Sequence, residues 1–325
     1  DKSIEENHLS EYKGIHLKSV LTIDKKGLSA MSASFFASIQ AAFSSCDVVH
    51  FHAEGPCATL WIPKLFGKRC IVTIHGLDHQ RAKWGKLAST YIMMGEKCAV
   101  KYADEIIVLS KGVQEYFQKT YGRKTVFIPN GVNKPSIVEA NLIQKRFKLN
   151  KNDYILYLGR IVPEKGIHYL IEAYSQIKTD KKLVIAGGSS DTDEYLKELK
   201  KMANHNKNIV FTGFVQGQIL DELYSNAYIY CLPSDLEGMP LSLLEAMSYG
   251  NCCLVSNIEE CSSVVDDKAV IFKKRDVEDL KNKLTSLVND SQLVYKYKEE
   301  AADYILSKYD WDKVTDKTLG LYERN

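Results

Sequence analysis

The 325-residue sequence contains no apolar run of about 18 residues, so we expect no transmembrane helix. Prolines are few, and the amino terminus is polar and unlike a signal peptide. Basic tracts with interleaved aromatic residues and zinc-ligand spacings are also lacking, which argues against a nucleic-acid-binding protein. None of the eight cysteines forms a C-x-x-C pair, and most lie inside apolar runs. We therefore interpret them as reduced core residues of a cytoplasmic protein.

The charge that is present is unevenly distributed. Residues 1–140 carry 18 Lys and Arg against 13 Asp and Glu, a balance of +5, whereas residues 141–325 carry 25 against 28, a balance of −3. The basic half suits an anionic partner, such as a membrane surface or a lipid phosphate. Ordinary solvated surface charge is the simpler explanation.

Apolar runs typical of buried strands alternate with helical patterns along both halves of the chain. In the first half we predict strands at 15–20, 47–51, 69–74, 105–109 and 125–128, and helices at 29–44, 56–66, 82–103 and 111–120. In the second half we predict strands at 154–158, 183–186, 209–212, 228–232, 252–255 and 270–272, and helices at 166–177, 193–203, 218–225, 240–249, 277–288, 292–306 and 311–322. This alternation predicts an α/β protein whose parallel sheets are covered on both faces.

The segment Pro129-Asn130-Gly131 interrupts the alternation and favours two domains. We place the first domain at residues 1–132 and the second at 133–308, with a C-terminal helix at 309–325 that is able to pack back on the first domain. Ligands of doubly wound sheets bind at the carboxyl ends of the strands. We therefore expect the functional site in a cleft between the two domains.

Two glutamates distinguish the segment that follows the strand at 228–232. Glu237 lies in a loop just before a predicted helix that begins at Pro240 and ends before Gly250, and Glu245 lies inside that helix among Leu and Met residues. Eight residues at helical rise span about 12 Å, the scale of a nucleotide diphosphate sugar. Free amides at the helix N-terminus favour an anion. A near-cap role for Glu237 and a structural ion pair for Glu245 are equally good interpretations of the spacing alone.

Two cations follow the first strand of the second domain. Gly159 ends that strand, Arg160 comes next, and Lys165 lies close to the following helix start. Arg can engage phosphate oxygens bidentately, and Lys acts as a point charge. A surface pair with Glu164 is the alternative, and we favour phosphate because both cations lie at the carboxyl end of a strand.

His75 closes the predicted strand at 69–74 and occupies the same kind of position in the first domain. It is suited to hydrogen bonding with a substrate hydroxyl or a phosphate, although a strand-end histidine is often structural. His50 and His52 flank Phe51 at another strand end. We interpret both as structural, with His52 the better candidate for the cleft.

Two short motifs allow more than one interpretation. Gly187-Gly188 permits close backbone approach to a ligand or simply a tight turn. Asp191-Thr192-Asp193 is a D-x-D triplet of the kind that binds a metal–diphosphate complex, but it precedes a helix, so capping explains it better. We predict no metal site.

These motifs together resemble the retaining nucleotide-sugar glycosyltransferases of family 4, which have the GT-B fold. The resemblance rests on the paired glutamates, Gly159-Arg160, Glu164-Lys165-Gly166, Thr212-Gly213-Phe214 and Pro129-Asn130-Gly131-Val132, in that family's order. It covers most of the chain and is most specific over 154–263. It implies two doubly wound, Rossmann-like domains that face each other across a cleft.

The first domain is similar to the family at lower specificity. The run His75-Gly76-Leu77-Asp78 with Arg81-Ala82-Lys83-Trp84-Gly85 resembles the rhamnosyltransferase-like branch that builds bacterial surface polysaccharides. Family members usually begin with a strand, a glycine-rich loop and a helix before anything like Ile15. We therefore expect the first domain of this chain to lack that N-terminal β-α-β portion.

The resemblance implies a role for each candidate residue. Arg160 and Lys165 hold the diphosphate and stabilise the leaving group, Glu245 binds the ribose hydroxyls, Glu237 contacts the transferred sugar and His75 lies beside it. The remaining donor-binding positions that it implies are Gly159, Gly213, Phe214, Val215, Gly238, Met239, Pro240 and Leu241.

The resemblance further implies transfer with retention, by attack on the same face as the leaving phosphate, without a metal or a cofactor beyond the nucleotide-sugar substrate. The acceptor is then a glycan or a polyprenyl-diphosphate-linked sugar, and the enzyme is cytoplasmic or peripheral at the inner face of the membrane. Segment 81–103 mixes Lys and Arg with apolar residues and suits either a membrane interface or core packing. Two other functions remain open: a sugar-nucleotide epimerase on the same fold, and a non-catalytic GT-B-like binding module.

Overall fold

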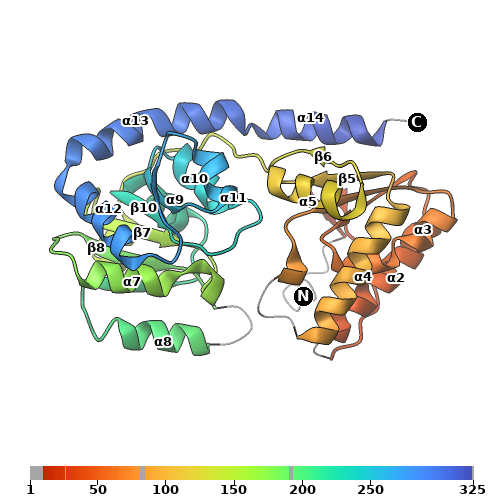
Figure 1. The fold of residues 1–325 in the computed structure, drawn as a ribbon, viewed down its shortest axis with the longest axis horizontal. Helices are drawn as coiled ribbons and strands as arrows, with labels where there is room; N and C mark the ends of the chain where they lie inside the picture. The colour runs from red at the N-terminus through yellow and green to blue at the C-terminus, as the bar shows by residue number, and fades with distance from the viewer. Residues whose placement is uncertain (1–9, 26, 81–84, 190–192, 324–325) are drawn as a thin grey trace. The chain divides into compact units, whose positions relative to one another are not determined.

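The computed structural model describes residues 10–25, 27–80, 85–189 and 193–323. Contacts divide the chain into two compact units, and each is described by itself. The first unit comprises Asp1–Ile107 with Arg123–Thr125, and the second comprises Val108–Gly122 with Val126–Asn325. Figure 1 shows the ribbon, coloured along the chain.

A parallel sheet forms the centre of the first unit. Strand β3 (Val48–His52) pairs in parallel with β4 (Arg69–Ile74), and β5 (Glu105–Val108) is the next strand in order. All of β4 after its first residue is buried, as expected for a strand covered on both faces. The helical elements of this unit are α2 (Leu28–Ala42), η1 (Gly55–Thr59), α3 (Trp61–Leu65), η2 (Asp78–Gln80) and α4 (Lys86–Tyr102).

Two predictions for the first unit are wrong in detail. Instead of a buried strand at 15–20, the chain forms an exposed antiparallel hairpin of β1 (Glu11–Tyr12) and β2 (Ile15–His16). The predicted helix at 56–66 is divided into the 3₁₀ helix η1 and the short α3. Pro63 explains the division, because a proline has no N–H to donate to the preceding turn.

The second unit is built on a six-stranded sheet with the order β12-β11-β10-β7-β8-β9. Each neighbouring pair is parallel, and crossovers lead from β7 to both sides of the sheet. This order confirms the predicted doubly wound α/β class. The strands are β7 (Tyr154–Leu158), β8 (Lys182–Ala186), β9 (Ile209–Gly213), β10 (Ile229–Leu232), β11 (Cys252–Ser256) and β12 (Val270–Phe272), and the unit also contains the short β6 (Val126–Phe127).

Helices cover both faces of this sheet, with α13 on one side and α7 and α8 on the other (Figure 1). The helical elements of this unit are α5 (Lys111–Tyr121), α6 (Leu142–Phe147), η3 (Pro163–Lys165), α7 (Ile167–Ser175), α8 (Glu194–Met202), α9 (Gln218–Asn226), α10 (Leu241–Ser248), α11 (Glu259–Val265), α12 (Val277–Asn289), α13 (Ser291–Lys308) and α14 (Trp311–Tyr322). The sequence did not predict α6 or α11. The N-terminus of α6 is completed by a distant residue, because the buried Glu222 carboxylate accepts hydrogen bonds from the N–H groups of Asn141 and Ile143.

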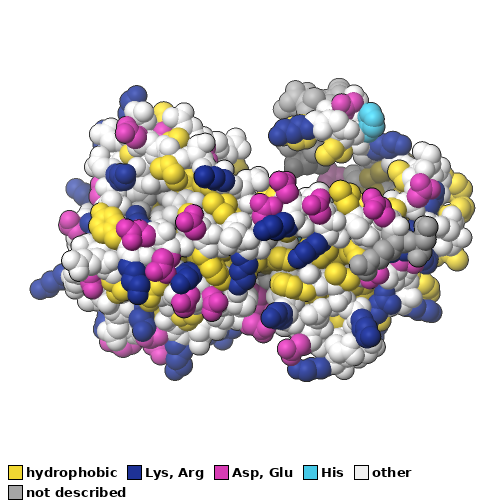
Figure 2. Space-filling view, turned by 90° about the horizontal axis from the view of Figure 1, so that it is seen from above, with side chains coloured by type: hydrophobic (Ala, Val, Ile, Leu, Met, Phe, Trp, Pro, Cys, Tyr) yellow, Lys and Arg dark blue, Asp and Glu magenta, His cyan; other side chains and the backbone are white. Residues whose placement is uncertain are grey.

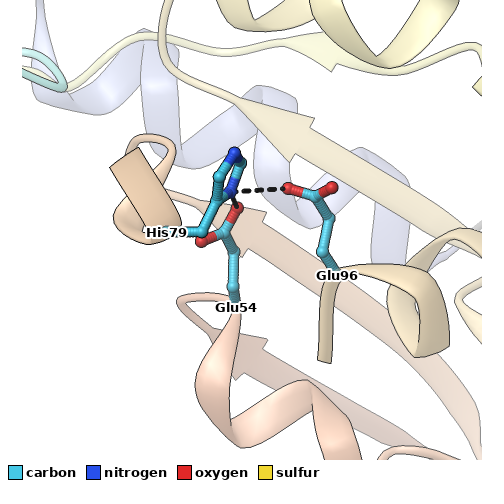
Figure 3. Close-up of side chains that lie close together, drawn as sticks. All are labelled: Glu54, His79 and Glu96. Atoms are coloured by element: carbon cyan, nitrogen blue, oxygen red, sulfur yellow. Dashed lines mark ion pairs between the residues drawn. The ribbon is translucent and has the colours of Figure 1, made fainter. Parts of the chain in front are cut away.

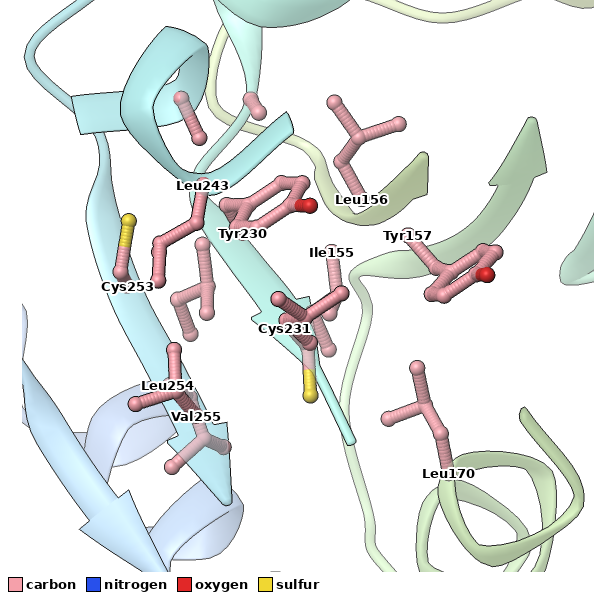
Figure 4. Packing of buried hydrophobic residues seen from close by; sticks show 14 of the residues in the cluster. Ile155, Leu156, Tyr157, Leu170, Tyr230, Cys231, Leu243, Cys253, Leu254 and Val255 are labelled. Atoms are coloured by element: carbon pink, nitrogen blue, oxygen red, sulfur yellow. The ribbon is translucent and has the colours of Figure 1, made fainter. Parts of the chain in front are cut away.

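Side chains from β7, β10 and β11 fill the core of the second unit (Figure 4). As predicted, Cys252 and Cys253 are buried strand residues, and neither forms a disulfide. The core also contains the large polar side chains of Tyr157 and Tyr230, whose hydroxyls need partners. The Tyr157 hydroxyl donates to the carbonyl O of Arg160 in the loop after β7, and the Tyr230 hydroxyl pairs with the hydroxyl of Ser242 in α10.

Figure 2 shows acidic and basic side chains mixed over the face that it draws, with hydrophobic patches between them. In the part of the chain that the structure describes, every helix is too short or too polar to traverse a bilayer.

Candidate functional site

Two loops at the carboxyl ends of β7 and β10 contact each other closely in the second unit. The N–H of Asp235 donates to the carbonyl O of Glu164 at 2.8 Å. Gly166 adopts φ 65°, and a Cβ at this position would overlap the carbonyl O of Pro233. A glycine is therefore needed here both for the left-handed backbone and for the approach of the two loops.

These loops bring Lys165 and Glu237 into contact. The Lys165 Nζ lies 2.5 Å from Glu237 Oε1 and 2.6 Å from Oε2, and the hydroxyl of Ser234 donates to Oε1 at 2.6 Å. The lysine side chain is 14% exposed and the glutamate side chain 6%. Lys165 thus pairs with Glu237 rather than with Glu164, and Glu237 is not a helix cap.

Arg160 combines a fixed backbone with an exposed side chain. Its carbonyl O accepts a hydrogen bond of 2.8 Å from the hydroxyl of Tyr157, which lies in β7. Burial holds the pKa of Tyr157 well above its usual range, so the phenol remains a donor. The guanidinium is therefore presented at the end of the strand by a backbone that the core anchors.

The segment that enters α10 is anchored from two directions. Pro240 is the N-cap, in an extended conformation, and the helix starts at Leu241. Asn130 holds the preceding Met239: its N–H donates to Met239 Sδ at 3.0 Å and its amide to the carbonyl O at 3.3 Å. The sequence marked Asn130 as part of a chain break and of a motif that resembles the family, but it did not predict this contact. Gly238 lies between Glu237 and these anchored residues.

Glu245 lies on α10 and lines a cavity of about 320 Å³. Its Oε2 accepts a hydrogen bond of 2.9 Å from the hydroxyl of Tyr224 on α9. Burial raises the pKa of Glu245 above its usual value. The partner required by this half-buried carboxylate is thus a phenol, not the cation that the sequence suggested. The cavity is also lined by Gly131, Val132, Asn133, Lys134, Pro135, Leu220, Asp221, Tyr224, Leu241, Ser248, Tyr249 and Trp311.

Three neighbouring strand ends carry the predicted glycines. Gly187 follows β8 with φ 150°, and a Cβ there would overlap the carbonyl O of Gly159. Its N–H donates to the carbonyl O of Gly213 at 3.0 Å. The close approach that Gly187 permits is therefore to backbone rather than to a ligand. Beside Gly213 (φ 73°), Phe214 is 74% exposed and Val215 is half-buried.

The D-x-D triplet lies partly outside the described residues, because Asp191 and Thr192 are not among them. Asp193 occupies the N-cap position of α8 but does not cap the helix with its side chain. Its Oδ1 accepts instead from the hydroxyl of Ser189. The predicted capping hydrogen bond is therefore wrong.

His75 belongs to the first unit, where it contacts His52. The Nε2 of His75 lies 3.1 Å from the Nδ1 of His52, and the two rings are stacked. His50 Nε2 lies 2.8 Å from Thr73 Oγ1 on the neighbouring strand, as expected for a structural histidine. Burial lowers the pKa of each of the three histidines, so all of them are neutral near pH 7. Arg81–Trp84 lie outside the described residues.

Comparison with known proteins gives the family. The family described as Glycosyl transferases group 1 matches residues 138–304, and the one described as Glycosyltransferase Family 4 matches residues 3–134. The chain belongs to the group 1 glycosyltransferases. The glycosyltransferase is 27% identical over 285 residues to the uncharacterized glycosyltransferase YqgM of Bacillus subtilis, covering 86% of this chain and 78% of the relative. It is also 27% identical over 297 residues to the UDP-Gal:alpha-D-GlcNAc-diphosphoundecaprenol alpha-1,3-galactosyltransferase of Escherichia coli, covering 85% and 75%.

Solved structures show the same fold. HepE of Anabaena, in a complex with UDP-glucose, superposes with a TM-score of 0.82 at 16% identity and covers 99% of this chain and 88% of its own. WaaG, a glycosyltransferase involved in lipopolysaccharide biosynthesis, superposes with a TM-score of 0.79 at 16% identity and covers 97% and 88%. The glycosyltransferase thus has the GT-B fold, with two Rossmann-like domains, as its sequence predicted.

Proposed function

We propose that this glycosyltransferase transfers a sugar, with retention, from a nucleotide diphosphate to a glycan or a polyprenyl-diphosphate-linked acceptor in bacterial surface-polysaccharide synthesis. Within the family we favour the rhamnosyltransferase-like branch. The observation that carries the proposal is the Lys165–Glu237 ion pair, held by two interlocked loops just before the N-terminus of α10. A cation, a carboxylate and free helix amides then lie together at one end of the sheet.

The charges suit departure of a nucleoside diphosphate. As the anomeric bond breaks, negative charge grows on the leaving phosphate, and Lys165, Arg160 and the amides of α10 stabilise it. The diphosphate competes with Glu237 for Lys165, and the carboxylate is released towards the sugar hydroxyls. The departing phosphate accepts the proton of the attacking acceptor hydroxyl. Because protein cations meet this charge, the transfer needs no metal ion.

The other residues are assigned by the same reasoning. Glu245, held by Tyr224 beside the cavity, binds the ribose hydroxyls. Gly213, Phe214 and Val215 at the end of β9 receive the base, and His75 is assigned to the transferred sugar. The known relatives support these ligand classes, because one is named for a GlcNAc-diphosphoundecaprenol acceptor and one structure was solved with UDP-glucose.

The test is a transfer assay with a panel of UDP, GDP and dTDP sugars and undecaprenyl-diphosphate-linked GlcNAc, without added divalent cation. We expect one donor class to raise the melting temperature and to yield a glycosylated lipid whose new anomeric centre, read by NMR coupling, keeps the donor's configuration. An isomerised nucleotide sugar formed without acceptor would show an epimerase instead. Absence of nucleotide binding by calorimetry would support a non-catalytic module.

A further inference from the structure

Three side chains of the first unit converge at a point that the proposed transfer does not use. Glu54 lies just before η1, His79 lies in η2 and Glu96 lies in α4 (Figure 3). His79 Nδ1 is 3.6 Å from Glu54 Oε1 and 3.4 Å from Glu96 Oε2. One nitrogen and one oxygen from each carboxylate thus lie within 4.8 Å of one another.

The backbone is built to allow this convergence. Gly95 precedes Glu96 in α4, and a Cβ at Gly95 would overlap the carbonyl O of Glu54. The helix can therefore approach η1 closely enough to bring the two carboxylates together. The N–H of Asp78 donates to Glu54 Oε2 at 2.9 Å, which fixes one oxygen and turns the other towards His79.

The environment makes this arrangement costly without a cation. Both glutamates are 0% exposed, and within the described residues Glu54 Oε1 has no hydrogen-bond donor. Two buried carboxylates this close are expensive to ionise together, and a positive ion between them offsets that cost.

We propose that Glu54, His79 and Glu96 form a binding site for a divalent transition-metal ion of the zinc type. The distances from His79 Nδ1 to the two carboxylate oxygens fit two ligands of one metal ion better than they fit hydrogen bonds. Good N–H···O bonds are about 2.7–3.2 Å long, whereas two ligands on a tetrahedral ion with bonds of about 2.0–2.2 Å are roughly 3.3–3.6 Å apart. An imidazole nitrogen favours Zn²⁺ or its neighbours over Mg²⁺ and Ca²⁺, which prefer oxygen.

The geometry of the three side chains also indicates how a metal ion would enter the site and what it would do there. The His79 side chain is 15% exposed, so an ion can enter on that side, and water completes its coordination. The ion links the end of β3, the loop after β4 and the middle of α4. It is structural, and it is distinct from the charges assigned to sugar transfer, which belong to the second unit.

The experiment uses the full chain, stripped with a chelator and dialysed, and Zn²⁺ as the probe. Competition with a chromophoric chelator gives the affinity, and elemental analysis gives the stoichiometry. We expect one Zn²⁺ per chain, a melting temperature raised by about 5 °C, and binding at least 100-fold weaker in His79→Ala and Glu96→Gln. Co²⁺ in place of Zn²⁺ should give a visible absorption band that both variants lose.

A matched control is His16→Ala, because His16 also pairs with a glutamate (Glu11, 3.6 Å) but is exposed to solvent. It should bind Zn²⁺ like the unchanged chain. Substoichiometric zinc in the unchanged chain, or unaltered affinity in His79→Ala, would overturn the proposal in favour of a proton shared within the cluster. The zinc stoichiometry of the unchanged chain already tests the proposal, so the test does not depend on whether the Glu96→Gln variant folds.

Discussion

Lys165 and Glu237, 72 residues apart in sequence, form a bidentate ion pair with Nζ–Oε distances of 2.5 and 2.6 Å. The pair is largely shielded from water, with 14% and 6% of the side chains exposed. Removing one partner of such a pair strands a charge, at a cost of about 3–5 kcal/mol. When no nucleotide sugar is bound, the charge of Lys165 and the charge of Glu237 neutralise each other. In the proposed reaction the diphosphate of the nucleotide sugar binds Lys165 and separates it from Glu237.

This relationship predicts different effects on stability and on activity. Lys165→Met should lower turnover by roughly 10²–10³-fold, since it removes a charge that stabilises the leaving group, and should also lower the melting temperature. The double variant Lys165→Met with Glu237→Gln should recover much of the melting temperature but none of the turnover. Thermal melts and transfer assays on the three variants measure both effects.

Lys119→Ala is the control, because Lys119 forms an exposed pair with Glu115. It should change neither quantity. If Lys165→Met kept near-normal turnover, or if the double variant were no more stable than the single ones, the ion pair would not have the role assigned to it.

The second prediction concerns the hydrogen bond from Tyr224 to Glu245. Tyr224→Phe should raise the KM for the donor by roughly 10-fold, the equivalent of about one hydrogen bond to a charged group, and leave the acceptor KM unchanged. Glu245→Gln should act in the same direction. Tyr295→Phe alters a half-exposed phenol and serves as the control. An effect on the acceptor KM alone would remove Glu245 from the donor site.

Local sequence predicted the elements well where the pattern was continuous. The apolar run that predicted β7 ends directly before Gly159, as the strand does. Pro240 and Gly250 marked the two ends of α10. The same reasoning placed Arg160 and Lys165 at a strand's carboxyl end. It failed for the hairpin at β1 and β2, whose apolar residues lack a covering layer.

The partners of the site residues could not be predicted from local patterns. Tyr224 contacts Glu245 and Asn130 contacts Met239 through tertiary packing, and nothing in their immediate sequence indicates it. Gly166 was visible as part of a motif. Its close approach to another loop, however, depends on the sheet order. Strand ends predict which loops meet, but the hydrogen bonds between them depend on how the loops pack.

The third prediction is a pH dependence of stability from His50. Burial, with His52 and His75 nearby, lowers the pKa of His50 to about 4 from 6.5. Above about pH 6.5 both folded and unfolded chains hold this histidine neutral. As the pH falls towards 4, the unfolded chain binds the proton first, so stability is progressively lost. His50→Asn should flatten the fall of the melting temperature between pH 6.5 and 4, and equal slopes in the two proteins would contradict this.

The last prediction concerns the exposed face of α4 in the first unit. Leu87, Met93 and Met94 are 90, 39 and 47% exposed, and they lie among the exposed Lys86, Lys97 and Lys101 of the same helix. The opposite face of α4 packs into the unit, so core packing accounts for only part of the apolar content of this helix. We propose that the exposed face lies at an anionic membrane interface, where apolar insertion and lysine charge act together.

Vesicles that contain anionic lipid should therefore float the protein at low salt, and high salt should weaken the interaction. Combining Leu87→Glu with Met94→Glu should reduce binding by about 10-fold or more, because two apolar contacts are replaced by charges that the lipid repels. Leu319→Glu changes an equally apolar, 46% exposed residue of α14 and should leave binding unchanged. If the unchanged chain stays unbound at both salt concentrations, this face of α4 has no membrane role, and the proposed lipid-linked acceptor would have to reach the enzyme by another surface.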